Sequence, residues 1–75
     1  KANNRKLKGV DFSGALLTLV DFSGADLSGA NFDGAQLREI DFSGANLTNA
    51  KLNAQMKQIK WDDKTIWPQG FSIEK

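Results

Sequence analysis

The sequence contains no cysteine, no histidine and no tyrosine among its 75 residues, and it has a single proline. Without cysteine the chain forms no disulfide and no thiolate metal site. Without histidine it lacks the imidazole that most proton shuttles, activated nucleophiles and zinc sites use. A chain this short also buries too small a fraction of its surface for an ordinary enzyme core. We therefore expect no enzymatic activity, no cofactor and no metal.

Excess charge and long apolar runs are also missing. Ten Lys and Arg against nine Asp and Glu give a formal net charge of +1, so we expect no direct nucleic-acid binding through a basic surface. No apolar run approaches the roughly 20 residues that span a bilayer. These features predict a soluble single domain over residues 1–75, and they do not distinguish cytoplasm, periplasm and lumen.

What the sequence does contain is a period of five over residues 5–54. When these residues are written as ten blocks of five from Arg5, the third residue of each block is Leu or Phe. The first residue is apolar in nine of the ten blocks. In the other slots only Leu16, Leu19 and Ala54 are apolar. This period fits neither the ~3.6-residue repeat of a helix nor the unbroken alternation of a long strand. It fits a short strand followed by a corner, and glycine, which suits a turn, ends six of the blocks.

The blocks also repeat at a longer interval. Two blocks without glycine, 15–19 and 35–39, lie 20 positions apart, and segment 11–30 resembles segment 31–50. We infer four blocks per coil of a β-solenoid, although the alternation of Phe and Leu would also permit two. The third positions then form the predicted core: Phe12, Phe22, Phe32, Phe42, Leu17, Leu27, Leu37, Leu47 and Leu52.

Three blocks, ADLSG (25–29), ANFDG (30–34) and ANLTN (45–49), resemble the pentapeptide repeat family, whose consensus is roughly A-(D/N)-L-x-x. The resemblance covers about two thirds of the chain and points to a bacterial or cyanobacterial kind of protein. It implies an all-β fold, the right-handed quadrilateral β-helix, with about 20 residues per coil. Residues 5–54 would then form two and a half to three coils, followed by a C-terminal cap.

The two ends depart from the repeat. Residues 1–4 are a polar N-terminal flank, too polar to cover Leu7 and Phe12, so we expect that end to be continued by a preceding domain or buried by self-association. Residues 55–75 form an irregular last turn and cap, where Met56 follows Leu52 by four positions instead of five. The expected cap residues, which could alternatively form a docking surface, are Trp61, Trp67, Pro68 and Phe71.

The candidate interaction surface comes from residues that break the polar exterior. Leu16 and Leu19 occupy outward slots, where exposed apolar clusters often mark contacts; they are covered either by the N-terminal segment or by a protein partner or second copy. Residues 11–50 carry a net charge of −5, and Asp21 and Asp41 are expected to stack in this acidic belt. We predict a non-catalytic interaction or scaffold module of a larger protein or assembly. The alternative is DNA mimicry, in which the acidic belt binds a topoisomerase, as the family resemblance implies, or another DNA-binding protein.

Overall fold

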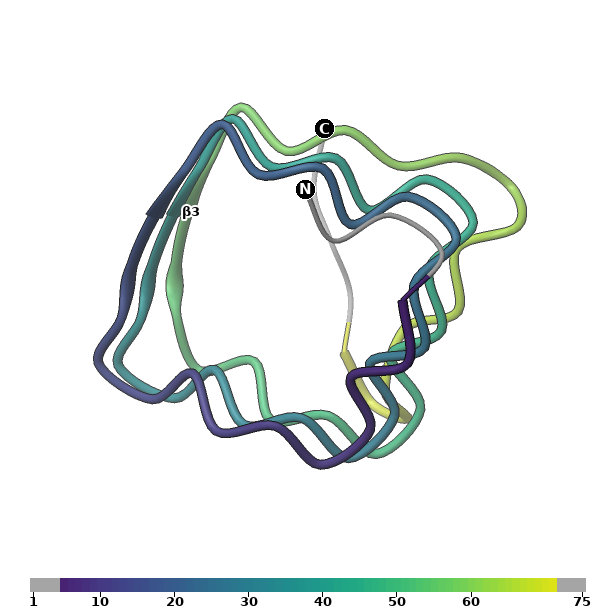
Figure 1. Cartoon of the computed structure of the whole chain (residues 1–75), viewed down its shortest axis with the longest axis horizontal. Helices are drawn as coiled ribbons and strands as arrows, with labels where there is room; N and C mark the ends of the chain where they lie inside the picture. The colour runs from purple at the N-terminus through teal and green to yellow at the C-terminus, as the bar shows by residue number, and fades with distance from the viewer. Residues whose placement is uncertain (1–4, 72–75) are drawn as a thin grey trace.

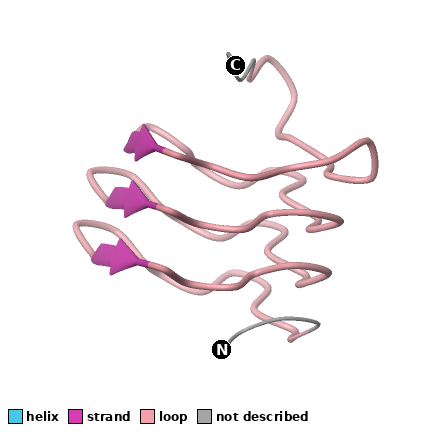
Figure 2. Cartoon of the chain, turned by 90° about the horizontal axis from the view of Figure 1, so that it is seen from above, coloured by secondary structure: helices cyan, strands magenta, loops and turns pink. Residues whose placement is uncertain are grey.

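The chain is an all-β structure without helices in residues 5–71, the part that the computed structural model describes. Its strands are β1 (Leu16–Thr18), β2 (Gln36–Arg38) and β3 (Gln55–Lys57). They pair in parallel in the order β1-β2-β3. The strands lie on one side of a stack of turns of the chain (Figures 1 and 2). The predicted fold class, all-β with parallel strands, is confirmed.

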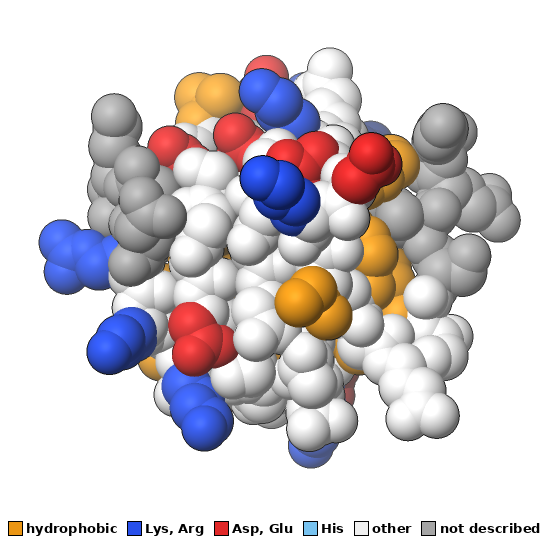
Figure 3. All heavy atoms as spheres, turned by 90° about the vertical axis from the view of Figure 1, so that its right-hand side faces the viewer, with side chains coloured by type: hydrophobic (Ala, Val, Ile, Leu, Met, Phe, Trp, Pro, Cys, Tyr) orange, Lys and Arg blue, Asp and Glu red, His pale blue; other side chains and the backbone are white. Residues whose placement is uncertain are grey.

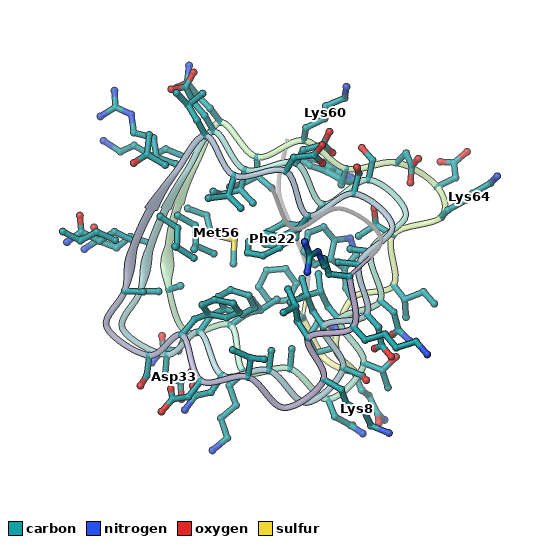
Figure 4. The ribbon with its side chains drawn as sticks, viewed as in Figure 1. Lys8, Phe22, Asp33, Met56, Lys60 and Lys64 are labelled. Atoms are coloured by element: carbon teal, nitrogen blue, oxygen red, sulfur yellow. The ribbon has the colours of Figure 1, made fainter. Side chains whose placement is uncertain are left out.

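A fixed register relates each turn of the chain to the next. The bridges Leu16↔Gln36, Asp21↔Asp41 and Asp26↔Asn46 all join residues 20 positions apart. Equivalent positions of successive turns therefore lie in columns. In Figure 4 the side chains of Phe22 and Met56 point into the interior, whereas those of Lys8 and Lys60 point away from it.

Two columns of phenylalanine fill the middle of the core. Phe12 stacks on Phe32 with ring centroids 5.0 Å apart, and Phe22 stacks on Phe42 at 5.7 Å. The two columns meet edge to face, as between Phe22 and Phe32 at 6.1 Å, a favourable arrangement for aromatic pairs. The other buried third-position residues are Leu27, Leu37, Leu47 and Leu52. Apolar residues at the first positions, five alanines and one isoleucine, complete the core: Ala25, Ala30, Ala35, Ile40, Ala45 and Ala50.

Phe12 and Leu17 differ from the rest of the predicted core because they are only half-buried. Both belong to the first turn of the stack, where a described turn packs against one side only. Their column partners in the next turn, Phe32 and Leu37, are 0% and 1% exposed. Both side chains still pack against the buried core, so they form its more exposed end.

Short polar side chains at the second position of the blocks accept hydrogen bonds from backbone N–H groups at the corners. The carboxylate of Asp21 accepts hydrogen bonds from the N–H and the hydroxyl of Ser23, at 2.9 and 2.6 Å. Asp26 binds Ser28 in the same way, and Asn46 binds Thr48. Such Asx turns explain why the second slot prefers Asp and Asn.

The slip at Met56 is one shortened corner. The register is 20 at Asn31↔Lys51 but 19 at Leu37↔Met56. At the corner between them, the N–H of Ala54 donates to the carbonyl of Leu52 (2.8 Å), two residues back instead of three. Met56 thereby stays in the column of Leu37 and is half-buried.

One extra residue in the corner Asp62–Lys64 restores the register, which is again 20 at Asn46↔Ile66. One turn earlier, the N–H of Gly24 donates to the backbone carbonyl of Ser43. The equivalent N–H of Gly44 donates instead to the carboxylate of Asp62, at 3.0 Å. The side chain thus replaces a backbone acceptor that the longer corner has displaced.

The predicted cap residues lie together at the C-terminal end, and all are half-buried. Trp67 contacts Phe42 edge to face with centroids 5.9 Å apart, so it covers the last ring of that column. Trp67 also contacts Trp61 at 6.4 Å and Phe71 at 5.3 Å. The expected flank 1–4 and the last cap residues, 72–75, lie outside the described residues.

We expect Phe32→Ala to lower the free energy of unfolding by about 3–5 kcal/mol, because the ring is fully buried and leaves a cavity. Phe12→Ala should cost clearly less, because Phe12 is half-buried. Urea denaturation of both variants followed by circular dichroism measures the difference. Equal losses would contradict the position of Phe12 at an open end.

Candidate interaction surface

Leu16 and Leu19 are the most exposed large apolar side chains of the described residues. Leu16 begins β1 and is 74% exposed, and Leu19 follows the strand and is 73% exposed. No described residue covers them, and residues 1–4 of the N-terminal segment, which was predicted as one possible cover, lie outside the described part of the chain. In the next turn the same slots hold Gln36 and Glu39. The fold therefore accepts polar side chains at both positions, and it does not require leucine.

Leu19 also has a backbone conformation that leucine rarely adopts. Its φ is +58°, like the glycines that end other blocks. A left-handed conformation costs an L-residue roughly 1–2 kcal/mol, and Asn tolerates it best after Gly. Because the side chain is mostly exposed, burial does not offset this cost. Leucine at position 19 is thus unfavourable for the isolated chain on two counts.

β1 is the edge of the described sheet, because β2 pairs with it on one side and no described strand lies on the other. Residues 15–20, Ala-Leu-Leu-Thr-Leu-Val, carry no charge. The side chains in register with Thr18 on β2 and β3 are Arg38 and Lys57. Leu16 and Leu19, the two predicted contact residues, thus lie in a segment whose own side chains carry no charge.

Asp21 and Asp41 lie in register on the side of the coil that follows the corner at Leu19. Both carboxylates accept the N–H of the serine two residues later, at 2.9 Å. The next residue in their column is Lys60. The structure therefore places the predicted carboxylates around a corner from the two leucines, and they serve the backbone of their own turns.

The other acidic columns are interrupted in the same way. Asp11 is followed by Asn31 and Lys51. Another column runs from Lys6 to Asp26 and then to Asn46. Figure 3 shows acidic side chains beside basic ones on one side of the molecule. The negative charge counted along the sequence is thus divided among several sides of the coil, each with a lysine.

The carboxylates at the corners are poor proton donors and acceptors for catalysis. Hydrogen bonds from the hydroxyl and the N–H of Ser28 hold the pKa of Asp26 below its ordinary 3.8. Ser13 lowers the pKa of Asp11 in the same way. Both groups are therefore ionised at neutral pH, where their function is to accept corner hydrogen bonds.

A hollow on the surface is lined by Ile59–Asp63. Burial alone would raise the pKa of Asp62, but hydrogen bonds from Lys64, Gly44 and Thr65 together lower it. This carboxylate is already an acceptor within the fold. Within residues 5–71, no group of three or more acidic side chains is arranged to hold a metal ion, and no helix could cross a bilayer.

The known proteins that this chain resembles share its five-residue repeat. The family pattern "Pentapeptide repeats" matches residues 6–44 and 25–54 with eight copies. A pentapeptide repeat protein from the cyanobacterium Cyanothece 51142 has a similar structure, with a TM-score of 0.81 and 34% identity over 85% of this chain. A pentapeptide repeat protein from the thylakoid lumen of Arabidopsis thaliana is also similar, with a TM-score of 0.70 and 38% sequence identity over 75% of this chain. The chain spans 44% and 40% of these two structures. No curated protein matches.

Replacing the strained leucine should stabilise the chain. We expect Leu19→Asn to raise the free energy of unfolding by about 1 kcal/mol, because Asn adopts a positive φ more readily. Asn49 has φ +61° at the equivalent slot of another block, so Asn49→Leu is the matched reverse change and should lower stability by a similar amount. Thermal unfolding measures both variants. A destabilised Leu19→Asn variant would mean that Leu19 makes stabilising contacts.

Proposed function

The chain belongs to the pentapeptide repeat family, and we propose that it is a non-catalytic protein-interaction or scaffold module whose contact surface contains Leu16 and Leu19. The observation that carries the proposal is the exposure of these two leucines, 74% and 73%. The same slots of the next turn hold Gln36 and Glu39. A side chain that neither packs nor suits its backbone is best explained by a contact outside the chain.

We also propose the finer architecture that the family implies for residues 1–75 as one domain. It is a right-handed β-helix of four-sided cross-section, with a C-terminal cap after residue 54. The register of 20 positions between bridged residues supports four blocks per coil. A rigid stack of this kind holds its outward side chains at fixed spacing, which suits a scaffold.

The absence of catalysis is part of this proposal. The carboxylates at the corners have lowered pKa values or accept backbone hydrogen bonds. A general acid or base needs a pKa near the working pH and a free proton position. An interaction role uses the exterior as it stands, without any group that reacts.

The alternative function is DNA mimicry through the acidic residues, including Asp21 and Asp41. A mimic needs charges spaced along one surface like phosphates, which follow each other at ~1.7 Å of duplex axis. Here the column of Asp21 and Asp41 continues to Lys60, and the column of Asp11 continues to Lys51. The charge distribution favours the interaction surface on the leucine side.

We expect the chain to leave DNA supercoiling by gyrase unchanged, because lysines interrupt its acidic columns. The assay compares supercoiling with and without increasing amounts of the protein. A double variant, Lys51→Glu with Lys60→Glu, would lengthen the acidic columns and serves as the comparison. Inhibition by the unmodified chain would favour DNA mimicry over the interaction role.

The contact surface is tested by the double variant Leu16→Asp with Leu19→Asp. We expect this variant to lose binding to the partner that the wild-type protein retains from its native extract. Its circular dichroism spectrum and thermal stability should stay close to those of the wild type, because both side chains are exposed. The matched control is Gln55→Asp with Gln58→Asp, the same slots in the turn of β3. If neither partner binding nor oligomer size changes in the leucine variant, these residues are not the contact surface.

A further inference from the structure

We propose that the outward face of the sheet binds an extended acidic segment of a partner protein. The carboxylate of this segment lies between Arg38 and Lys57, and a neighbouring apolar side chain of the segment lies on Leu16. The inference rests on the proposed function, since it names the chemistry of the partner that contacts the leucines. Three features of the described residues support it: two cations without ion pairs, a groove lined by hydrogen-bond donors, and the distance from this groove to the exposed leucine.

Arg38 on β2 and Lys57 on β3 place two positive charges side by side. The two residues are in register, and both side chains are exposed. Neighbouring strands lie about 4.8 Å apart, and like charges on adjacent strands repel and destabilise a sheet. Neither cation forms an ion pair with a residue of the described part of the chain. The same slot of β1 holds Thr18, so the fold does not require a cation there, and the pair indicates a negatively charged ligand.

A groove between β2 and β3 connects the two cations. It has a volume of about 120 Å³ and is lined by Gln36, Leu37, Arg38, Gln55 and Lys57. Four of these side chains can donate hydrogen bonds, and none is acidic. The groove is larger than the ~30 Å³ share of one water, but it is smaller than the ~300 Å³ at which pockets for free small molecules begin. It therefore has room for the end of an acidic side chain and not for a cofactor.

A carboxylate matches this groove better than a phosphate does. An arginine guanidinium donates two parallel hydrogen bonds to the two oxygens of a carboxylate, and a lysine ammonium supplies a further donor. Arg38, Lys57 and Glu39, which follows Arg38 at the corner, together carry a net charge of +1. One carboxylate balances this charge, whereas a phosphate group brings up to about two negative charges, which Glu39 repels more strongly. The acidic group of the partner is thus an Asp or Glu side chain.

The exposed Leu16 lies within reach of the same segment. It is 74% exposed and in register with Gln36, so Arg38 lies one strand away and two residues further along. For the usual spacings of a sheet, the Cα atoms of Leu16 and Arg38 are then roughly 8 Å apart. In an extended segment, side chains on one face recur at every second residue, about 6.8 Å apart. A segment that lies obliquely across the sheet therefore reaches the leucine and the groove with two side chains separated by one residue.

An NMR titration of the isotope-labelled chain with the peptide acetyl-Ala-Leu-Ala-Glu-Ala-amide tests this inference. We expect saturable changes in the signals of Leu16, Arg38 and Lys57. The same peptide with Gln in place of Glu should bind at least about fivefold more weakly, because an ion pair at a surface contributes up to ~1 kcal/mol. Equal affinity of the two peptides, or no change in these signals, would overturn the inference.

The double variant Arg38→Gln with Lys57→Gln tests the cations themselves. It should bind the Glu peptide at least about fivefold more weakly than the wild type, and it should unfold at no lower temperature, because it removes a repulsion between exposed side chains. The matched control, Lys51→Gln with Lys60→Gln, removes the same charge from other columns of the coil and should bind like the wild type. Equal losses in both double variants would mean that the peptide responds to net charge alone, which would contradict a specific groove.

Inorganic phosphate and acetate, each titrated alone, separate a docking surface from a simple anion site. Both should bind the groove more weakly than the Glu peptide does, because neither has an apolar side chain to contact Leu16. Phosphate or acetate that displaces the peptide at an equal concentration would overturn the inference, since the groove would then select for charge and not for a protein segment.

This inference and the proposed function can fail separately. The control of the leucine test, Gln55→Asp with Gln58→Asp, places a carboxylate in the lining of the groove. Loss of the native partner in that control would support an acidic partner segment, and retention of the partner would contradict it. If Leu16→Asp with Leu19→Asp loses the partner but the groove binds no acidic peptide, this inference is overturned and the proposed function stands.

Discussion

The parallel register of 20 positions between successive turns is the constraint on which this structure depends. Every backbone bridge between turns keeps it or its one-residue variant. The register places equivalent slots in columns, so Phe stacks on Phe and Leu lies beside Leu. A small chain without disulfides is thereby held by repeated contacts between neighbouring turns, each of which buries the face of the next.

The same constraint explains how irregular corners are tolerated. The shortened corner at Ala54 and the lengthened one at Asp62–Lys64 change the register to 19 and then back to 20. Carboxylates supply acceptors at both places: Asp33 accepts the N–H of Asn53, and Asp62 accepts the N–H of Gly44. Polar side chains at the corners thus stabilise the fold. The exposed leucines Leu16 and Leu19 have no such structural role, so they are the better indication of a contact surface.

The proposed contact surface lies where the repeat is broken at a cost to the isolated chain. Leu19 combines a positive φ with 73% exposure, and Leu16 is equally open. Both adjoin an uncharged strand edge, whereas the other two strands carry Arg38 and Lys57. These features coincide at one end of the stack. A contact with another chain would account for the two exposed leucines together, which is why we propose an interaction role.

The sequence by itself determined the all-β class, the family and the period that separates Leu and Phe slots from polar ones, because each pentad encodes its own short strand and corner. It also marked Leu16 and Leu19, since an apolar residue in a polar slot is visible without coordinates. Only the tertiary structure decided that the corner at Ala54 is shortened, that the corner at Asp62–Lys64 is lengthened, and that the resulting register places Lys60 in the column of Asp21 and Asp41. These properties depend on the backbone geometry of individual corners, which the period of five and its 20-residue repeat do not specify.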